Sequence, residues 1–308
     1  MNKVSVYGKG LTKSYGKTEA LKSVSFSVEK GEIFGFIGPD GAGKTTLFRL
    51  LTTLLLPDLG AASIEGLDVV KDYRRLRQIL GYMPGRFSLY QDLSVEENLR
   101  FFAGIFKVSI SDNYHLIADI YEQIAPFAKR RAGKLSGGMK QKLALSCALI
   151  HKPEVLILDE PTTGVDAVSR REFWEMLIRL KQSGITILVA TPYMDEAMLC
   201  DRVALIQHGT IMATGSPADI IQTYPHKLFR IKSQNTLQLL RIMRQMPELK
   251  SAEMFGEYIH IGSSPNKMNE SDIAAFLNQN NIRQFDLEPM EAGIEDCFMH
   301  LMKQQSST

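Results

Sequence analysis

The sequence is poor in cysteine, has one tryptophan and contains no long hydrophobic run. Its three cysteines, Cys147, Cys200 and Cys297, lie far apart and lack the spacing of a metal site, so we expect reduced, buried thiols. No stretch approaches the ~18 consecutive apolar residues that a membrane-spanning helix needs. The segment Met1–Gly10 is polar and lacks the apolar core of a signal peptide. We therefore expect a soluble, intracellular protein that reaches a membrane only through a partner.

The sequence also lacks an excess of charge of either sign. Lysine and arginine number 36 and aspartate and glutamate 34, which gives a net charge of +2. A nearly neutral chain gives no electrostatic reason to expect nucleic-acid binding. The short cluster Arg74, Arg75 and Arg77 is interpreted as a solvated helix face. A hydrophobic content of 44% over 308 residues is ordinary for a globular protein with one large domain and a smaller one.

Short apolar runs alternate with amphipathic helical patterns from about Phe26 to Thr214. The patterns predict helices at Lys44–Leu55 and about Val168–Lys181. The apolar runs predict strands at Phe26–Val28, Ile33–Ile37, Val155–Leu158, Ile185–Val189 and Val203–Ile206. This alternation predicts an α/β fold with a predominantly parallel sheet flanked by helices.

Two segments depart from the alternation. The region around Ser94–Asp119 predicts a helical insertion, which we place at about 86–134. After Tyr224-Pro225 the pattern becomes that of a small α+β domain. Its predicted strands are Leu228–Ile231, Tyr258–Ile261 and Ile282–Leu287, and its predicted helices are Thr236–Met246, Ser271–Asn280 and Ile294–Lys303. We therefore expect one domain at 1–224 and a second at 225–308.

The loop after Ile33–Ile37 matches the phosphate-binding pattern G-x-x-x-x-G-K-[ST], between a predicted strand and a predicted helix. Its glycines allow backbone N–H groups to turn toward phosphate oxygens, and the helix N-terminus adds positive potential. Lys44 can reach the β- and γ-phosphates, and the Thr45 hydroxyl can bind Mg²⁺. The predicted nucleotide-binding residues here are Gly38, Pro39, Asp40, Gly41, Ala42, Gly43, Lys44, Thr45 and Thr46.

Two acids follow the apolar run Val155–Leu158. At this strand end Asp159 is predicted to lie near the metal, directly or through water, so that Thr45 and Asp159 are the candidate Mg²⁺ residues. Glu160 then lies where it can polarise an attacking water, which makes it the candidate catalytic base. Such a pair at a strand end is specific only because the phosphate-binding loop lies upstream in the same domain.

A second anion-binding feature occurs at Leu135–Gln141. Ser136 is placed to cap the helix that follows, and Gly137 and Gly138 expose backbone N–H groups there. A chain needs two phosphate-binding surfaces only if they meet across a dimer.

In these ordered motifs the sequence resembles an ABC transporter nucleotide-binding domain over roughly Val4 to Thr223. The resemblance implies a P-loop NTPase core of the ABC ATPase type with a helical subdomain. It implies that the signature, LSGGM at Leu135–Met139, closes over ATP held by a partner subunit. It further implies that Tyr15 stacks on adenine and that Thr163–Asp166 contacts the opposite subunit.

The subfamily resemblance is to ATPases of ABC-2-type exporters. It is carried by the phosphate-binding loop, by Met194–Ala197 and by Gly293–Phe298. It implies ATP and Mg²⁺ as ligands, separate permease chains, a position on the cytoplasmic face of the membrane and an accessory role for the C-terminal domain. Phe87, Leu89 and Tyr90 are candidate anchors for the permease, the alternative being that they are core residues of the insertion.

Two positions depart from the family pattern. Gly85 stands where the family has a glutamine that contacts Mg²⁺, and Pro192 stands where it has a histidine that contacts the γ-phosphate. Proline has no N–H to donate, and the loss of one preorganised donor typically costs about 10²–10³ in rate. One hypothesis is an asymmetric pair, in which this chain holds a slow or non-hydrolytic site and completes a competent site on another ATPase. The rival is a homodimer in which Glu160 suffices. A regulatory ATP-binding module and a non-transport ABC ATPase remain further alternatives.

Overall fold

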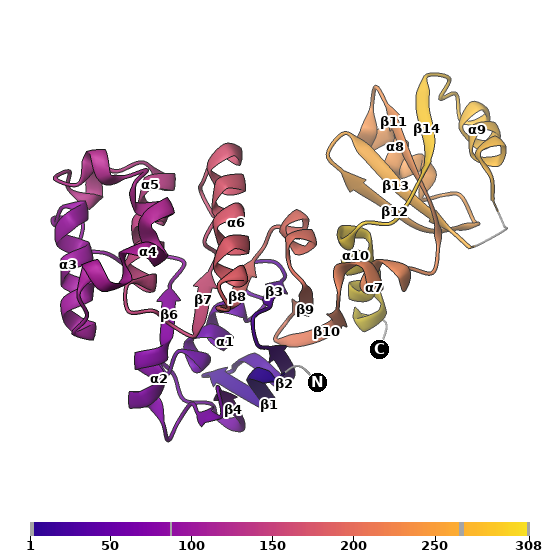
Figure 1. The fold of residues 1–308 in the computed structure, drawn as a ribbon. Helices are drawn as coiled ribbons and strands as arrows, with labels where there is room; N and C mark the ends of the chain where they lie inside the picture. Colours follow the sequence, from indigo (N-terminus) through magenta and orange to yellow (C-terminus); the bar gives the residue numbers. More distant parts are fainter. Residues whose placement is uncertain (1–2, 87, 265–267, 307–308) are drawn as a thin grey trace. The chain divides into compact units, whose positions relative to one another are not determined.

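The computed structural model describes residues 3–86, 88–264 and 268–306, which form two compact units, Met1–Pro217 and Ala218–Thr308 (Figure 1). The division falls before the Tyr224-Pro225 boundary that the sequence suggests. The reason is that the helix α7 (Pro217–Gln222) packs with the second unit, where Cys297 Sγ lies 3.6 Å from the carbonyl oxygen of Ile220. Within the described residues no helix is long and apolar enough to span a bilayer.

The first unit is built on a six-stranded sheet in the order β10-β9-β3-β8-β7-β6. Five of these strands are parallel, and β10 pairs antiparallel with β9 at the edge. The strands are β3 (Ile33–Ile37), β6 (Leu80–Met83), β7 (Val155–Asp159), β8 (Thr186–Thr191), β9 (Arg202–Gln207) and β10 (Thr210–Gly215). Every residue of β3, β7 and β8 is buried, as expected of strands covered on both faces. The predicted α/β fold with a predominantly parallel sheet is confirmed.

A second, antiparallel sheet in the order β2-β1-β4-β5 was largely missed by sequence reasoning. Its strands are β1 (Val4–Tyr15), β2 (Thr18–Glu29), β4 (Leu59–Ile64) and β5 (Leu67–Asp68). The register of β1 against β2 shifts several times, so side chains do not alternate regularly in the sequence. Only Phe26–Val28, at the end of β2, gives a clear apolar run. Phe26 packs against Phe36 of the central sheet with ring centroids 5.1 Å apart, which joins the two sheets in one core.

Helices cover the central sheet. They are α1 (Lys44–Leu51), α2 (Tyr73–Ile79), α6 (Ala167–Gln182) and the 3-10 segment η3 (Met194–Leu199). The helix predicted to reach Leu55 ends at Leu51, because Thr53 adopts a left-handed φ of 61° and breaks the turn. Leu54 is consequently exposed instead of buried on a helical face.

Among its described residues, the predicted helical insertion at about 86–134 contains two α-helices and two short 3-10 segments, and a third α-helix, α5, follows it directly. Ser94 caps the first helix in a capping box with Glu97, and Lys107, in a left-handed conformation, ends it. The elements are α3 (Val95–Phe106), α4 (Ile110–Tyr121), η1 (Ala125–Phe127), η2 (Ala132–Lys134) and α5 (Gly137–Leu149). The insertion therefore leads directly into the second anion-binding feature, Ser136–Gly138, at the N-terminus of α5.

The second unit has the element order β-α-β-β-α-β and the sheet order β12-β13-β11-β14, which is the ferredoxin-like arrangement. Its core lies between this antiparallel sheet and the helices α8 and α9, with Phe229, Ile259 and Leu277 at its centre. The strands are β11 (Lys227–Ser233), β12 (Leu249–Phe255), β13 (Tyr258–Ser263) and β14 (Phe285–Met290), and the helices are α8 (Thr236–Met243), α9 (Glu270–Gln279) and α10 (Ile294–Ser306). The strand β12 was missed, and β14 lies three residues later than predicted.

Candidate functional site

The phosphate-binding loop joins the buried strand β3 to the N-terminus of α1. Gly41 and Gly43 have φ values of 78° and 106°, a region that favours glycine. Gly38 is needed for another reason, since a Cβ there would lie 2.1 Å from the carbonyl oxygen of Ile206 in β9. The loop is thus packed against the sheet, with its N–H groups and the start of α1 available to an anion.

The side chain of Lys44 is folded back onto its own loop. Its Nζ donates to the carbonyl oxygens of Gly38 at 2.8 Å and of Pro39 at 3.0 Å, and lies 3.7 Å from Glu160 Oε1. The side chain is buried, and burial lowers the pKa of Lys44, an effect that the nearby carboxylates of Glu160, Asp40 and Asp159 oppose. A phosphate that entered the loop would offer this ammonium group stronger, charged acceptors than the two carbonyls.

The two residues predicted to hold Mg²⁺ lie together. Thr45 Oγ1 donates to Asp159 Oδ1 at 3.1 Å, although the residues are far apart in the sequence. Burial raises the pKa of Asp159, and the hydrogen bond from Thr45 opposes that rise. One hydroxyl and one carboxylate fit the way Mg²⁺ binds, with few protein oxygens supplemented by phosphates and water. No cluster of three or more histidine, cysteine or acidic residues forms a metal cage among the described residues.

Glu160 directly follows β7 and has a left-handed φ of 52°, unusual for a residue other than glycine. Its N–H donates to the carbonyl oxygen of Ala190 in β8 at 2.8 Å, which holds the turn against the sheet. Its carboxylate is partly exposed and lies between Lys44 Nζ and Thr163 Oγ1, the latter at 3.4 Å. This position, at the carboxyl end of the sheet beside the loop lysine, suits a general base acting on a phosphoryl group.

The second anion-binding feature has the predicted cap. Ser136 Oγ accepts a hydrogen bond from the N–H of Met139 at 3.3 Å, and Gly137 and Gly138 form the first turn of α5. A Cβ on Gly137 would lie 3.2 Å from the carbonyl oxygen of Gly164, so the signature packs on the loop that follows Glu160. In Figure 1, α5 lies beside α3 and α4 of the helical insertion, apart from α1 and the phosphate-binding loop. The two anion-binding features are therefore separate surfaces of one chain.

Tyr15 lies at the end of β1 with its side chain exposed, available for stacking on a planar ligand. In the loop predicted to contact a second subunit, Asp166 caps α6 by accepting a hydrogen bond from the N–H of Ser169 at 3.0 Å. His208 occupies the two-residue turn between β9 and β10.

The two departures from the family pattern flank the acids. Gly85 is exposed beyond β6, and a Cβ there would lie 3.0 Å from the carbonyl oxygen of Asp159. Pro192 follows β8 directly. The carbonyl oxygen of Thr191 accepts a hydrogen bond from the N–H of Gly38 at 3.2 Å. Pro192, the next residue along the chain, therefore lies near the phosphate-binding loop.

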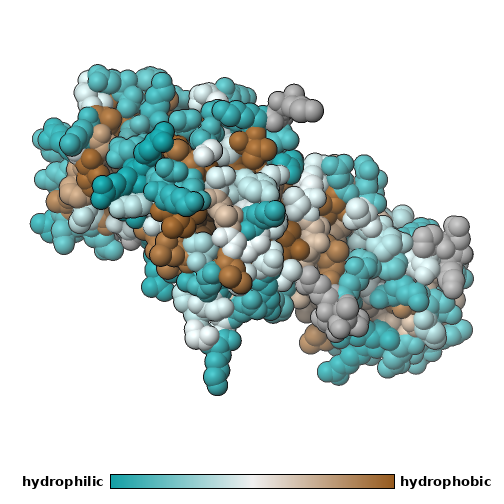
Figure 2. Space-filling model, turned by 90° about the horizontal axis from the view of Figure 1, so that it is seen from below, coloured by the Kyte–Doolittle hydropathy of each residue, from teal (hydrophilic) through white to brown (hydrophobic). Residues whose placement is uncertain are grey.

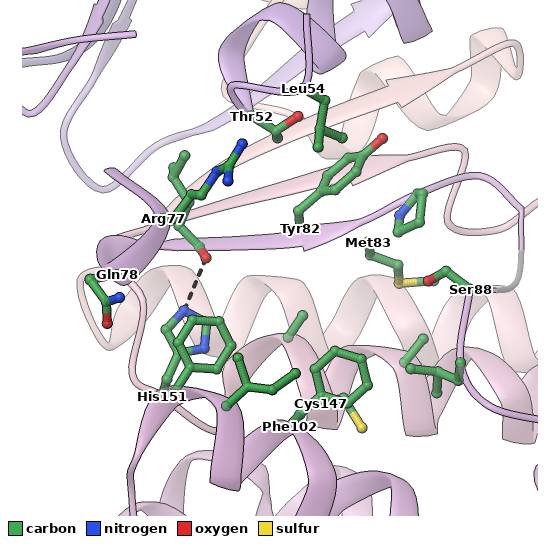
Figure 3. Close-up of a pocket in the computed structure, with 17 residues that line it drawn as sticks. Thr52, Leu54, Arg77, Gln78, Tyr82, Met83, Ser88, Phe102, Cys147 and His151 are labelled. Atoms are coloured by element: carbon green, nitrogen blue, oxygen red, sulfur yellow. Dashed lines mark hydrogen bonds between the residues drawn. The ribbon is translucent and has the colours of Figure 1, made fainter. Parts of the chain in front are cut away.

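A cavity of about 480 Å³ lies between the central sheet and the helical insertion (Figure 3). Its wall combines the aromatic and aliphatic side chains of Phe102, Ile105 and Phe106 with the polar residues Arg77 and Gln78. His151 at its base donates from Nε2 to the carbonyl oxygen of Leu80, 2.9 Å away, and stacks on Phe106 with ring centroids 3.7 Å apart. No sequence pattern indicates this cavity, because its wall is assembled from segments distant along the chain.

The predicted permease anchors have different environments. Leu89 is buried and lines the cavity, whereas Tyr90 is exposed and packs edge-on against Phe101 with ring centroids 4.7 Å apart. Phe87 lies outside the described residues. Leu54 and Leu56, between α1 and β4, are also exposed, and Figure 2 shows hydrophobic patches on the face seen from below.

Sequence reasoning also missed a buried polar cluster beside Glu160. Thr162 Oγ1 donates to Glu196 Oε1 at 2.6 Å, and Arg170 Nε lies 3.8 Å from the same oxygen. The guanidinium of Arg170 stacks over the ring of Tyr193 at 4.2 Å. The run Met194–Ala197 carries part of the subfamily resemblance, but nothing in its sequence indicates which of its residues forms a hydrogen bond with Thr162.

Comparisons with known proteins agree with this geometry. A family model described as ABC transporter matches residues 21–163. The chain is 43% identical over 217 residues to "Probable multidrug ABC transporter ATP-binding protein YbhF" of Escherichia coli (strain K12), a match that covers 70% of this chain and only 38% of that protein. It is 37% identical over 261 residues to "Nod factor export ATP-binding protein I" of Rhizobium sp. (strain N33), covering 83% of this chain and 85% of that protein. It is 40% identical over 222 residues to "Doxorubicin resistance ATP-binding protein DrrA" of Mycobacterium tuberculosis (strain ATCC 25618 / H37Rv), covering 70% and 67%.

Solved structures with this fold include an ATP-binding subunit of an ABC transporter, with a TM-score of 0.66 and 28% identity over 71% of this chain and 93% of that one. Another is a dimeric ATP-binding cassette in a post-hydrolysis state bound to ADP and phosphate, with a TM-score of 0.62 and 25% identity over 68% of this chain and 98% of that one. The predicted P-loop NTPase core is thus confirmed.

Proposed function

Since the chain belongs to the ABC transporter family of ATP-binding proteins, we propose that it is the ATP-hydrolysing motor subunit of a membrane exporter whose permease is a separate chain. The observation that carries the proposal is the convergence of four residues from two segments that are distant along the chain. Thr45 lies within hydrogen-bonding distance of Asp159, and Glu160 lies 3.7 Å from Lys44. The name of one relative, "Nod factor export ATP-binding protein I", supports the direction of transport.

The proposed chemistry follows from these positions. ATP enters with its phosphates against the N–H groups of the loop and the N-terminus of α1, and Lys44 exchanges the carbonyls of Gly38 and Pro39 for phosphate oxygens. Thr45 and Asp159 would hold Mg²⁺, which when bound neutralises charge on the phosphate oxygens. Glu160 orients and deprotonates the water that attacks the γ-phosphate. The adenine ring stacks on Tyr15.

The proposed assembly is a dimer with ATP at its interface. Ser136, Gly137 and Gly138 present a capped helix N-terminus away from the chain's own phosphate-binding loop. Such a surface can contact the phosphates of ATP when the phosphate-binding loop of a second subunit lies opposite to it. A dimeric cassette among the related structures supports this arrangement.

The proposed contact with the permease is the cavity beside the helical insertion. A groove lined by Leu89, Phe102 and Phe106 suits a short helix that inserts an apolar side chain, while Arg77 and Gln78 provide polar partners at its side. The proposal places the chain on the cytoplasmic face of a membrane through this contact.

A second candidate, the asymmetric pair, is favoured by Gly85 and Pro192. Neither residue supplies the side-chain hydrogen bond that the family's glutamine or histidine provides, so hydrolysis in this chain's own site would be slow. Its intact Ser136–Gly138 would then complete a faster site on a different ATPase subunit. In a homodimer, by contrast, both sites carry the same two departures and Glu160 acts in each.

Light scattering after size exclusion, with MgATP present, tests the dimer. In the Glu160→Gln variant ATP is not consumed, and we expect a dimer of this chain if it pairs with itself. Ser136→Asp is the matched variant, because aspartate still caps α5 but sets a negative charge against the phosphates. It should bind ATP normally and stay monomeric. A Glu160→Gln chain that binds ATP yet remains monomeric would favour the asymmetric pair, and a chain that does not bind ATP would refute the proposed function.

A further inference from the structure

A buried carboxylate ties together the two loops that flank Glu160. Glu196, in η3 after β8, is 1% exposed, and its Oε1 accepts a hydrogen bond from Thr162 Oγ1 at 2.6 Å. Thr162 is also 1% exposed and stands two residues after Glu160. Neither residue belongs to the phosphate-binding loop, the acid pair at the end of β7 or the signature, so the nucleotide chemistry leaves this contact unexplained.

Thr162 lies in the loop that follows the candidate catalytic base Glu160. The N–H of Val165 donates to the carbonyl oxygen of Thr162 at 3.2 Å, and the N–H of Thr163 donates to the carbonyl oxygen of Glu160 at 3.3 Å. Gly164, at the tip of the loop, is the residue against which Gly137 of the signature packs. A change at Thr162 therefore reaches both Glu160 and the signature through short backbone contacts.

Glu196 also faces an arginine with which it makes no hydrogen bond. Arg170 Nε lies 3.8 Å from Glu196 Oε1, within ion-pair range but beyond the usual hydrogen-bond length. Arg170 Nε and Glu196 Oε2 are both buried without a hydrogen-bond partner. Leaving buried polar atoms unpaired is unfavourable. Because a shift of less than about 1 Å would bring the pair to hydrogen-bond length, the two groups can pair when the loop and α6 move slightly.

The segment between β8 and Glu196 places this pair next to the nucleotide. Thr191 contacts Gly38 of the phosphate-binding loop, Pro192 follows it, and the ring of Tyr193 lies under the guanidinium of Arg170 at 4.2 Å. Proline has no hydrogen to donate to a phosphate. The segment can therefore act on the site through its anchored end at Glu196, even without a donor at position 192.

Resting on the proposed function, we propose that Glu196 is a positioning residue for hydrolysis. Through its hydrogen bond with Thr162, Glu196 fixes the position of the loop that begins at Glu160. The distance between Glu196 and Arg170 shortens when nucleotide occupies the phosphate-binding loop. ATP binding in this way changes the position of Glu160 and of Gly164, the loop residue against which Gly137 of the signature packs.

The chain contains an intrinsic fluorescent probe close to Arg170. Trp174 is the sole tryptophan, lies one helical turn after Arg170 on α6, and is buried with its Nε1 unpaired. We expect a non-hydrolysable ATP analogue with Mg²⁺ to change its fluorescence. Glu196→Gln removes the charge but nearly keeps the shape, and Thr162→Val removes only the hydroxyl. Each should abolish the fluorescence change while ATP affinity by calorimetry stays within about threefold.

Turnover gives the second readout. A misplacement of Glu160 should lower kcat by about 10- to 100-fold with KM nearly unchanged. The double variant should fall no further than the more severe single one, because both substitutions break the same contact. Arg171→Met is the matched control: it removes a charge from the same turn of α6, but Arg171 is exposed and paired with Glu175 on the same helix. It should keep both the fluorescence change and the turnover.

The inference is wrong if the Glu196→Gln and Thr162→Val chains fold, bind ATP and retain the wild-type fluorescence change and kcat. That result would leave the proposed function standing. If one variant does not fold, the other decides, with Arg170→Lys as a third that keeps the charge and shortens the reach. A wild-type chain that does not bind ATP would instead refute the proposed function on which the inference rests.

Discussion

Acidification should destabilise the first unit through His151. The imidazole is 9% exposed, lies flat on Phe106 and contacts the carbonyl oxygen of Leu80 through Nε2 (Figure 3). Burial lowers the pKa of His151 from 6.5 to about 4, although the contact with Leu80 acts in the opposite direction. The folded state therefore keeps this side chain neutral at pH values where the unfolded chain protonates it.

The sign and size of the effect follow from linkage. Between pH 6.5 and 4 the unfolded state binds the additional proton, so the free energy of unfolding falls as the pH falls through this range. With these two pKa values, lowering the pH from 7 to 5 should remove about 2 kcal/mol of stability. This is a large part of the 5–15 kcal/mol of a typical domain.

Urea unfolding followed by Trp174 fluorescence measures this free energy in the first unit, since the sole tryptophan lies on α6. The His151→Gln variant provides the comparison, because other titrating groups contribute equally to both chains and cancel in the difference. We expect the wild-type chain to lose about 2 kcal/mol more than the variant between pH 7 and pH 5. His115→Gln, at an exposed position in α4, should behave as the wild type does. Equal losses in the wild type and His151→Gln would refute the claim that a neutral imidazole is buried at this cavity.

Three further predictions concern the nucleotide site. Gly38→Ala should weaken ATP binding by at least about 10-fold in calorimetry, because its Cβ would clash with the carbonyl oxygen of Ile206 and displace the loop; unchanged affinity would contradict the observed packing. Thr45→Val should reduce the gain in ATP affinity that Mg²⁺ provides and leave metal-free binding nearly unchanged, since it removes the hydroxyl beside Asp159; equal weakening with and without the metal would count against a metal role. Pro192→His should raise kcat by about 10-fold or more if the missing donor limits hydrolysis, and an unchanged kcat would eliminate that explanation.

Sequence patterns predict those parts of the fold and site that depend on neighbouring residues. The phosphate-binding loop lies between β3 and α1 as expected, and α6 matches its predicted range to within one residue at each end. The antiparallel sheet of β1 and β2 was missed because repeated register shifts erase the alternation that marks a strand. The end of α1 was misplaced because a single left-handed residue, Thr53, outweighs a continuing apolar pattern.

The site shows the same division between local and distant information. The contact between Thr45 and Asp159 could be predicted because each belongs to a motif with its own chemical signal. The contact of Glu196 with Thr162 could not, because neither residue type is unusual at its position and only the fold brings the two together. The cavity at His151 was missed for the same reason, since β6, α3 and α5 assemble its wall.

MgATP hydrolysis by the purified chain, measured beside Glu160→Gln, tests the central claim most directly. The account predicts turnover that disappears in the variant while ATP affinity stays the same, because Glu160 acts on the water and does not hold the nucleotide. Turnover that persists in Glu160→Gln would contradict the account, since the catalytic base would then have to be another residue.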